Sequence, residues 1–203
     1  MTERILSLDV STKTGWALLV SDGENFTLEK YGKIDKTTEP EGQYPGNYID
    51  WAYDVWASIC AIKDELKPDV LVIEETSAGS KSIYAQKILE WIHFLLAKTI
   101  KECNIKVTYL LTEQWRRETG CLMTKEESKH NKAVKKFKEK NNTSIAYNEE
   151  GKRIGKITRK HVNIRRANEI FLKFLKEPLR KKDEDVADSL LLAFCYHLRR
   201  KLR

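Results

Sequence analysis

Carboxylates in apolar surroundings are the residues of this sequence best suited to do chemistry. Asp9 lies inside the apolar run ILSLDV, and Glu74 and Glu75 end a second such run, DVLVIEE. Asp185 and Asp188 are three residues apart in DVADSLLLA, a spacing that puts both on one face of a helix. An ionised carboxylate in such a place is costly unless it is paired or binds a cation.

Carboxylates that converge from distant segments form a hard-oxygen site suited to Mg²⁺ or Mn²⁺. Two such ions about 4 Å apart support in-line attack of water on a phosphodiester. Each residue also has an ordinary alternative. Asp185 could favour a helix N-terminus through the helix dipole, and Asp9 could bind backbone donors of the STKTG turn that follows it. Taken together, the carboxylates predict a metal site.

One ambiguity remains at the end of the second apolar run. Glu74 and Glu75 are neighbours in a strand, so their side chains point to opposite faces of the sheet. Both faces are expected to be covered, and the periodicity therefore leaves open which glutamate shares a face with Asp9.

The elements that would position these carboxylates follow a definite order. Short turns join the first three strands, which favours antiparallel neighbours, whereas the fourth strand is continuously apolar, as buried parallel strands are. This order predicts an α/β fold: a mixed five-stranded sheet, three antiparallel strands then parallel strands, with helices on both faces. The expected strands are 4–10, 15–21, 26–34, 69–75 and 106–111, and the expected helices are 47–66, 81–101, 112–119, 158–175 and 183–198.

Length and charge indicate one domain with an anionic partner. The chain has 203 residues, enough for a single domain with a real core. Residues 125–182 hold 19 Lys and Arg against 7 Asp and Glu, a balance of +12, so the remainder carries 7 − 12 = −5. We interpret the lysine-rich part at about 122–157 as an insertion into the domain 1–203. The uneven charge favours nucleic acid over a merely solvated lysine-rich surface.

The rest of the composition excludes several classes. No stretch approaches the ~20 apolar residues of a membrane span. The chain reaches its first strand almost at once, so no signal peptide is expected. The four cysteines are scattered without a CxxC pair, and the four histidines form no ligand pair. These features predict a protein of a reducing compartment that does not span a membrane.

As an ordered set, the motifs resemble those of the RuvC-type Holliday junction resolvases of the RNase H-like superfamily. The matching segments are LSLDVSTKTGWALL, LVIEE and DEDVADSLLLA, with KHVNIRRANEIF before the last of them, and they span nearly the whole chain. The resemblance implies that Asp9, Glu74, Asp185 and Asp188 are catalytic metal ligands, and it favours Glu74 over Glu75. It also implies two Mg²⁺ ions per site, which Mn²⁺ can replace.

The resemblance further implies a function and an assembly. Members are homodimeric endonucleases that cut four-way DNA junctions by paired nicks, and the helix after the fourth strand contributes to their dimer. Lys160 matches a basic position near the scissile phosphate, which implies a catalytic role; contact with the phosphate backbone is the alternative. The residues expected to contact DNA are Lys125, Lys129, Lys132, Lys135, Lys136, Arg116, Arg117, Arg159 and Lys160.

Two features depart from the family pattern. Ser77 stands where some members carry an aromatic residue that enters the junction. The lysine-rich segment is longer than in compact members and would add phosphate contacts that raise affinity without reading sequence. The combination resembles bacteriophage-type relatives with broad activity on branched DNA. This resemblance implies a cytoplasmic, DNA-associated protein of a bacterium or a phage-infected cell. Trp115, beside two arginines, is a further candidate for DNA contact.

Two other functions fit parts of the pattern. An actin-like or sugar-kinase phosphotransferase shares the sheet order and a turn like STKTG, but it needs a second lobe with a glycine-rich motif, for which 203 residues with nine glycines leave no room. A non-catalytic module that binds branched DNA on the same fold would not need its carboxylates. Substituting the carboxylates distinguishes this module from an enzyme.

Overall fold

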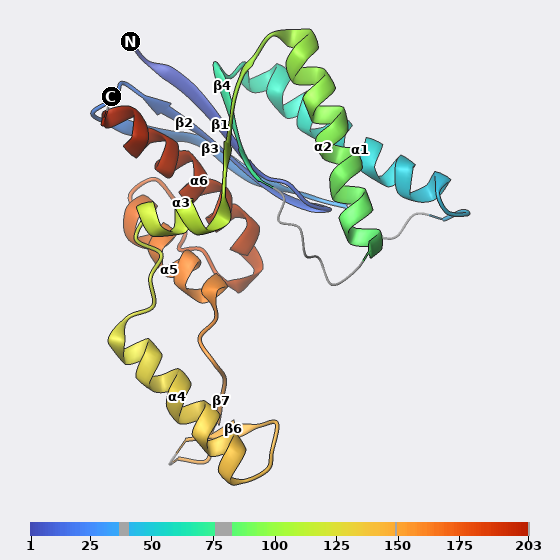
Figure 1. Ribbon diagram of the computed structural model, residues 1–203. Coiled ribbons are helices and arrows are strands. Elements are labelled where there is room, and N and C mark those ends of the chain that lie inside the picture. The colour runs from blue at the N-terminus through green and yellow to red at the C-terminus, as the bar shows by residue number, and fades with distance from the viewer. Residues whose placement is uncertain (37–40, 76–82, 149, 203) are drawn as a thin grey trace.

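The computed structural model describes residues 1–36, 41–75, 83–148 and 150–202. A five-stranded sheet in the order β3-β2-β1-β4-β5 forms its centre (Figure 1). β1 pairs antiparallel with β2 and parallel with β4, so the sheet is mixed as predicted. The strands are β1 (Glu3–Asp9), β2 (Lys13–Ser21), β3 (Phe26–Asp35), β4 (Val70–Glu74) and β5 (Lys106–Leu110).

Helices cover both faces of this sheet, which confirms the predicted α/β architecture. α1 (Gly46–Leu66) and α2 (Ile83–Cys103) lie on one face, and α6 (Glu184–Lys201) crosses the other (Figure 1). β1 alternates between the two layers: Ile5 packs in the α6 core, whereas Leu6 and Leu8 pack in the α1 and α2 core. Two buried cores therefore hold β1 rigidly between them.

The parallel register of β1 and β4 places their carboxyl ends side by side. Leu8 is paired with Ile73, one residue before Asp9 and Glu74 respectively. Both strands end at this edge of the sheet, and the Asp9 and Glu74 side chains there belong to neither core. This edge is where the fold can bring together residues from distant segments.

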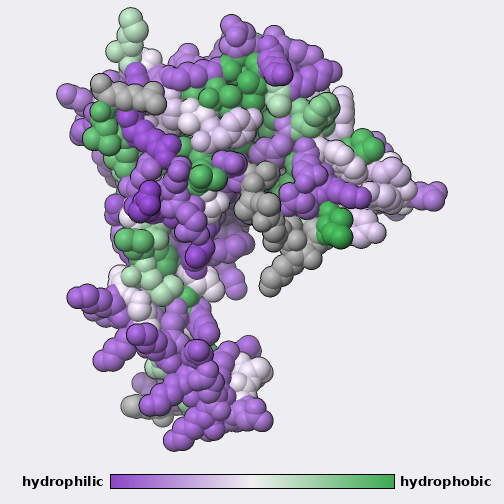
Figure 2. Space-filling model, viewed as in Figure 1, coloured by the Kyte–Doolittle hydropathy of each residue, from purple (hydrophilic) through white to green (hydrophobic). Residues whose placement is uncertain are grey.

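The lysine-rich segment forms an arm that extends away from the body (Figure 1). It consists of helix α4 (Lys125–Lys140) and a hairpin of two short strands, β6 (Ala146–Tyr147) and β7 (Arg153–Ile154). Figure 2 shows its surface as mostly hydrophilic. The apolar pattern predicts no element here, yet Thr124 and Glu127 form a capping box that starts α4.

The remaining elements lie near their predicted places. α3 (Thr112–Glu118) follows β5, and α5 (Arg159–Phe171) leads through a short 3₁₀ turn (Lys181–Asp183) into α6. The prediction that the helix after residue 158 reaches 175 is wrong, because Phe174 and Leu175 both donate to the Phe171 carbonyl in a tight turn. Within the described residues, no helix is both long and apolar enough to span a membrane.

Candidate metal and DNA-binding site

Four carboxylates gather at the carboxyl ends of β1 and β4. Asp9 ends β1, Glu74 ends β4, and Asp185 and Asp188 come from the start of α6. Burial raises the pKa of Asp9 well above its usual range, and the negative charges of Asp188 and Glu74 raise it further. A hydrogen bond between the Asp9 and Glu74 carboxyls acts on the pKa in the same direction. Like charges from two strands and one helix therefore lie close together at this edge of the sheet and repel one another.

A glycine lets α6 approach this edge. Gly15 of β2 is the register partner of Asp9. A Cβ atom on Gly15 would lie 1.9 Å from the backbone oxygen of Asp185, so the α6 backbone rests directly on the strand. Ser7 fixes the same helix further along, because its buried hydroxyl donates to the Ser189 carbonyl at 2.7 Å. Close packing of α6 on β1 and β2 thus brings its carboxylates to Asp9.

The structure distinguishes the two glutamates at the end of β4. The Glu74 side chain is half-buried and accepts hydrogen bonds from the Thr112 hydroxyl and, at 3.2 Å, from the Trp115 indole. Glu75 is exposed. Trp115 is fully buried, so the prediction that it contacts DNA is wrong. Its ring packs in the core and its indole nitrogen orients Glu74.

Asp188 is the most buried of the four carboxylates, with 8% of the residue exposed. Burial raises its pKa to about 7, against the opposing effect of a hydrogen bond from Asn163. Asn163 is itself buried and donates from Nδ2 to Asp188 Oδ1 at 2.7 Å. The Arg116 guanidinium lies 4.0 Å from the other oxygen. Burial also raises the pKa of Asp185, and Lys160 opposes that shift.

The chemistry of these donors fits a divalent metal. All four ligand candidates are oxygen donors in a partly buried place, and a 2+ cation between them would relieve their repulsion. Within the described residues, no three His, Cys, Asp or Glu side chains already have the arrangement of a finished ligand set. The side chains must therefore turn toward an ion for it to be held by three or more of them.

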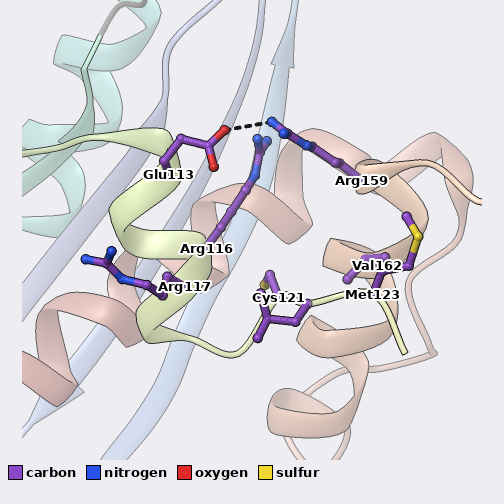
Figure 3. A pocket seen from close by; sticks show the side chains of 8 residues that line it. Glu113, Arg116, Arg117, Cys121, Met123, Arg159 and Val162 are labelled. Atoms are coloured by element: carbon purple, nitrogen blue, oxygen red, sulfur yellow. Dashed lines mark hydrogen bonds and ion pairs between the residues drawn. The ribbon is translucent and has the colours of Figure 1, made fainter. Parts of the chain in front are cut away.

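An open cleft gives access to Asp9 and Glu74. It has a volume of about 350 Å³, and its lining includes Asp9, Glu74, Thr112 and Arg116. Arg116 also lines a second cavity of about 390 Å³ between α3 and α5 (Figure 3). A phosphate in the cleft would therefore have a guanidinium beside it.

Only some of the basic residues predicted to contact DNA from the body of the protein lie close together. Arg116 and Arg159 point into the same region, where Arg159 is paired with Glu113 at 2.7 Å, whereas Arg117 points away from both (Figure 3). Lys160 is paired with Glu184, the residue before Asp185. Lys160 thus lies beside the carboxylates, on the side where α5 meets α6.

The predicted lysines of the arm lie on the surface of α4. Lys125, Lys129, Lys132 and Lys136 recur at helical spacing on a face of α4 away from the buried Val134. Lys135 lies beside this row and pairs with Glu139 at 3.6 Å. Among the ion pairs of the described residues, none includes the four aligned lysines. We call these four residues the lysine row.

Several residues that shape the site are not predicted from the sequence. They are Gly15, Thr112 and Asn163, together with the new role of Trp115. Asn163 has one signal, since it is a polar residue on the otherwise apolar side of α5. Gly15 and Thr112 have no signal, because their roles depend on the packing of α6 and α3 against the sheet.

Comparison with solved structures finds Holliday junction resolvases among the proteins of similar fold. RuvC of Thermus thermophilus in complex with a Holliday junction substrate matches with a TM-score of 0.63 and 12% identity, covering 100% of this chain and 96% of that one. The same protein solved as "Thermus thermophilus RuvC structure" matches with a TM-score of 0.62, 14% identity and the same coverage. The yeast mitochondrial Holliday junction resolvase Ydc2 matches with a TM-score of 0.58 and 10% identity, covering 98% of this chain and 79% of that one.

At these identities the comparisons show the fold. The chain has the RNase H-like fold of RuvC and of other Holliday junction resolvases, which confirms the fold that the motif resemblance implies. A bacteriophage-type origin stays a prediction. No protein-family model matches the sequence, and no curated protein matches it.

Proposed function

We propose that this protein is a metal-dependent endonuclease that resolves Holliday junctions and other branched DNA by paired nicks. In this proposal, water attacks the phosphodiester and leaves 5′-phosphate and 3′-hydroxyl ends. The crowding of Asp9, Glu74, Asp185 and Asp188, which raises the pKa of Asp9 and Asp188, carries the proposal. It is supported by the fold that the chain shares with RuvC, whose structure was solved with a Holliday junction substrate.

Each part of the chain has a definite task in this proposal. The four carboxylates hold Mg²⁺ or Mn²⁺, two ions per site, which supply charge stabilisation and an activated water when bound. Asn163 orients Asp188, and Thr112 and Trp115 orient Glu74. Lys160, beside the carboxylates, neutralises charge on the phosphate. Because Lys160 pairs with Glu184 in the structure, the phosphate must compete for it.

Binding is assigned to other residues than cleavage. The lysine row, with Lys135 and the body residues Arg116, Arg117 and Arg159, contacts phosphates, which position DNA without reading its sequence. Two copies of the chain form a homodimer, so that each active site nicks one strand of the four-way junction.

The test is a nicking assay on a labelled four-way junction with Mg²⁺, beside linear duplex, flaps and forks. Wild type is expected to nick the junction near its branch point. Asp9→Asn and Asp188→Asn should bind the junction but lose nicking to background, whereas Asp54→Asn, an exposed acid on α1, should behave as wild type. Wild type that binds and never nicks would show a non-catalytic module for branched DNA. Normal cutting by both site variants would exclude this site.

A further inference from the structure

Three tyrosines gather where α1 and α2 begin. Tyr44 comes two residues before α1, Tyr48 lies in the first turn of α1, and Tyr84 lies in the first turn of α2. The ring centroids are 5.7 Å apart for Tyr44 and Tyr48, 5.6 Å for Tyr44 and Tyr84, and 5.5 Å for Tyr48 and Tyr84. Tyr44 is 40% exposed and Tyr84 53%, so the cluster presents ring surface to solvent.

A lysine completes the cluster. Lys87, one turn after Tyr84, donates from Nζ to the Tyr44 hydroxyl at 2.7 Å and lies 5.2 Å from the centre of that ring. The hydrogen bond to Tyr44 raises the pKa of Lys87, which keeps the ammonium charged. Within the described residues, no carboxylate lies within ion-pair distance of it. Exposed rings beside an un-neutralised cation are the combination that single-stranded nucleic acid recognises.

A groove connects these rings to the carboxylate cleft. It measures about 250 Å³, and its lining includes Tyr48, Trp51 and Tyr84 together with Ser11 and Thr12. Ser11 and Thr12 belong to the turn that directly follows the strand of Asp9. Leu89 lines both the groove and the carboxylate cleft, so the two hollows are neighbours.

The size and lining of the groove limit what it can hold. Its volume is below the range of about 300–1,000 Å³ typical of pockets for whole small-molecule ligands. A single planar, mostly apolar group with an anion next to it fits both the aromatic walls and Lys87. An unpaired DNA base with its phosphate is such a group, and the function proposed for the nearby carboxylate cleft already requires a DNA strand.

We propose that Tyr48 and Tyr84 stack on one unpaired base of the strand that enters the carboxylate cleft, while Lys87 contacts a neighbouring phosphate. This inference rests on the proposed function, because it needs branched DNA at the carboxylates. It adds a reason for preferring a branch point to duplex: a base that leaves its partner recovers stacking on the tyrosines. Duplex DNA offers no free base and gains nothing there.

The experiment uses a four-way junction that carries 5-iododeoxyuridine at one position beside the branch point, in a series of substrates that varies the position. The full-length protein binds the junction in EDTA, so no strand is cut, and light cross-links the iodouracil to aromatic residues in contact with it. Mass mapping of the cross-linked peptide is expected to find Tyr84 or Tyr48 for one position. The affinity of each variant for junction and for linear duplex is measured alongside.

Three variants and one control make the result specific. Tyr84→Leu keeps apolar volume without a planar ring and should lower junction affinity roughly 5- to 100-fold, as loss of one stacked base does. Tyr84→Phe keeps the ring and should bind as wild type, and Lys87→Gln should weaken binding and its salt dependence. Tyr53→Ala is the control, because Tyr53 lies on α1 with 52% exposure and packs on Trp56 instead.

Two results would overturn the inference: cross-links that map to none of the three tyrosines, or a folded Tyr84→Leu with the affinity and junction preference of wild type. A change in the sedimentation of free Tyr84→Leu, together with cross-links that map to none of the tyrosines, would reassign the cluster to a contact between copies of the chain. Because the measurements need no cleavage, they are separate from the nicking assay. Nicking that depends on Asp9, combined with failed cross-linking, would remove this inference alone.

Discussion

The buried surroundings of Asp188 favour its neutral carboxyl over its ionised carboxylate. Its pKa in the folded protein is about 7, above the value of 3.8 for an ordinary aspartate, so the fold favours the protonated form. The free energy of unfolding of the metal-free protein should therefore decrease as the pH rises from about 4 to about 7. Asp9, whose pKa is also raised, adds to this decrease.

Thermal unfolding of the metal-free protein at pH 5.5 and pH 8 measures this effect. Wild type should melt at a lower temperature at pH 8, and Mg²⁺ should raise that temperature because it binds the ionised carboxylates. Asp188→Asn should show a smaller decrease in melting temperature between the two pH values, because the variant lacks the titrating carboxyl. Its amide oxygen can still accept the hydrogen bond from Asn163. An equal decrease in the variant would mean that Asp188 is not the titrating group.

At the scale of single residues, the sequence predicts the charged residues of the site and misses the neutral ones. The carboxylates stand out because a charge in an apolar run has few inexpensive explanations, and the structure brings all four to one edge. The sequence alone cannot choose between Glu74 and Glu75, and the family resemblance favours Glu74. In the structure Glu74 lies close to Asp9, whereas Glu75 is exposed. Asn163 and Thr112 are ordinary residues in their own segments. Only the three-dimensional packing shows that they hold carboxylates.

At the scale of elements, the contact between β2 and α6 decides whether the carboxylates meet. Gly15→Ala would place a methyl group against the Asp185 backbone, so α6 must move away from the strand. We expect the free energy of unfolding to fall by about 1–3 kcal/mol, as in overpacked cores, with a larger relative loss of nicking at a temperature where the variant is folded.

Gly46→Ala is the matched control, because nothing lies within 4 Å of the added Cβ atom. Denaturant unfolding followed by circular dichroism gives the stability, and the junction assay gives the activity. A Gly15→Ala protein with wild-type stability and nicking would show that α6 can shift without affecting the site.

The lysine row has a consequence that salt titration can measure. Lys129→Gln, Lys132→Gln and Lys136→Gln together should lower junction affinity and reduce the slope of log affinity against log salt by about 0.9 for each phosphate that is no longer neutralised. The same charge change at Lys30, Lys98 and Lys101, on the body, should leave the slope nearly unchanged. An unchanged slope in the arm variant would exclude α4 from the DNA interface.

Helix α4 also shows why one element escapes prediction. Its inward face has few apolar residues, and Val134 is its one buried residue, so the apolar stripe that identifies most helices is nearly absent. The capping box at Thr124 and Glu127 is readable in the sequence. Without an apolar stripe next to it, that signal is too weak to identify a helix.

At the scale of the whole molecule, the paired nicking that we propose would use two copies of the chain. Phe94 of α2 is 70% exposed, on the helix that the family resemblance assigns to the dimer. We expect wild type to have twice the chain mass of 23.7 kDa in light scattering, and Phe94→Lys to move toward the monomer. The variant should then nick one strand of a junction without a paired nick in the second strand.

Leu172→Lys is the control for Phe94→Lys, since Leu172 is 57% exposed and lies beyond α5 on another part of the surface. A dimer that survives Phe94→Lys would place the interface elsewhere, and a monomeric wild type that makes paired nicks would remove the requirement for a dimer. The order of strands and helices is enough to predict the fold. The sequence has no comparable signal for which exposed apolar residues meet a second chain.

The small core of the arm has a consequence for its motion. Val134 and Ala146 are the fully buried apolar residues of the arm, whereas β1 and α6 are buried on long stretches. Local opening requires less free energy where fewer apolar contacts break, so amide protons of α4 should exchange with deuterium much faster than those of α6. Bound junction DNA should slow exchange in α4, whereas linear DNA of the same length, held by fewer contacts, should slow it less.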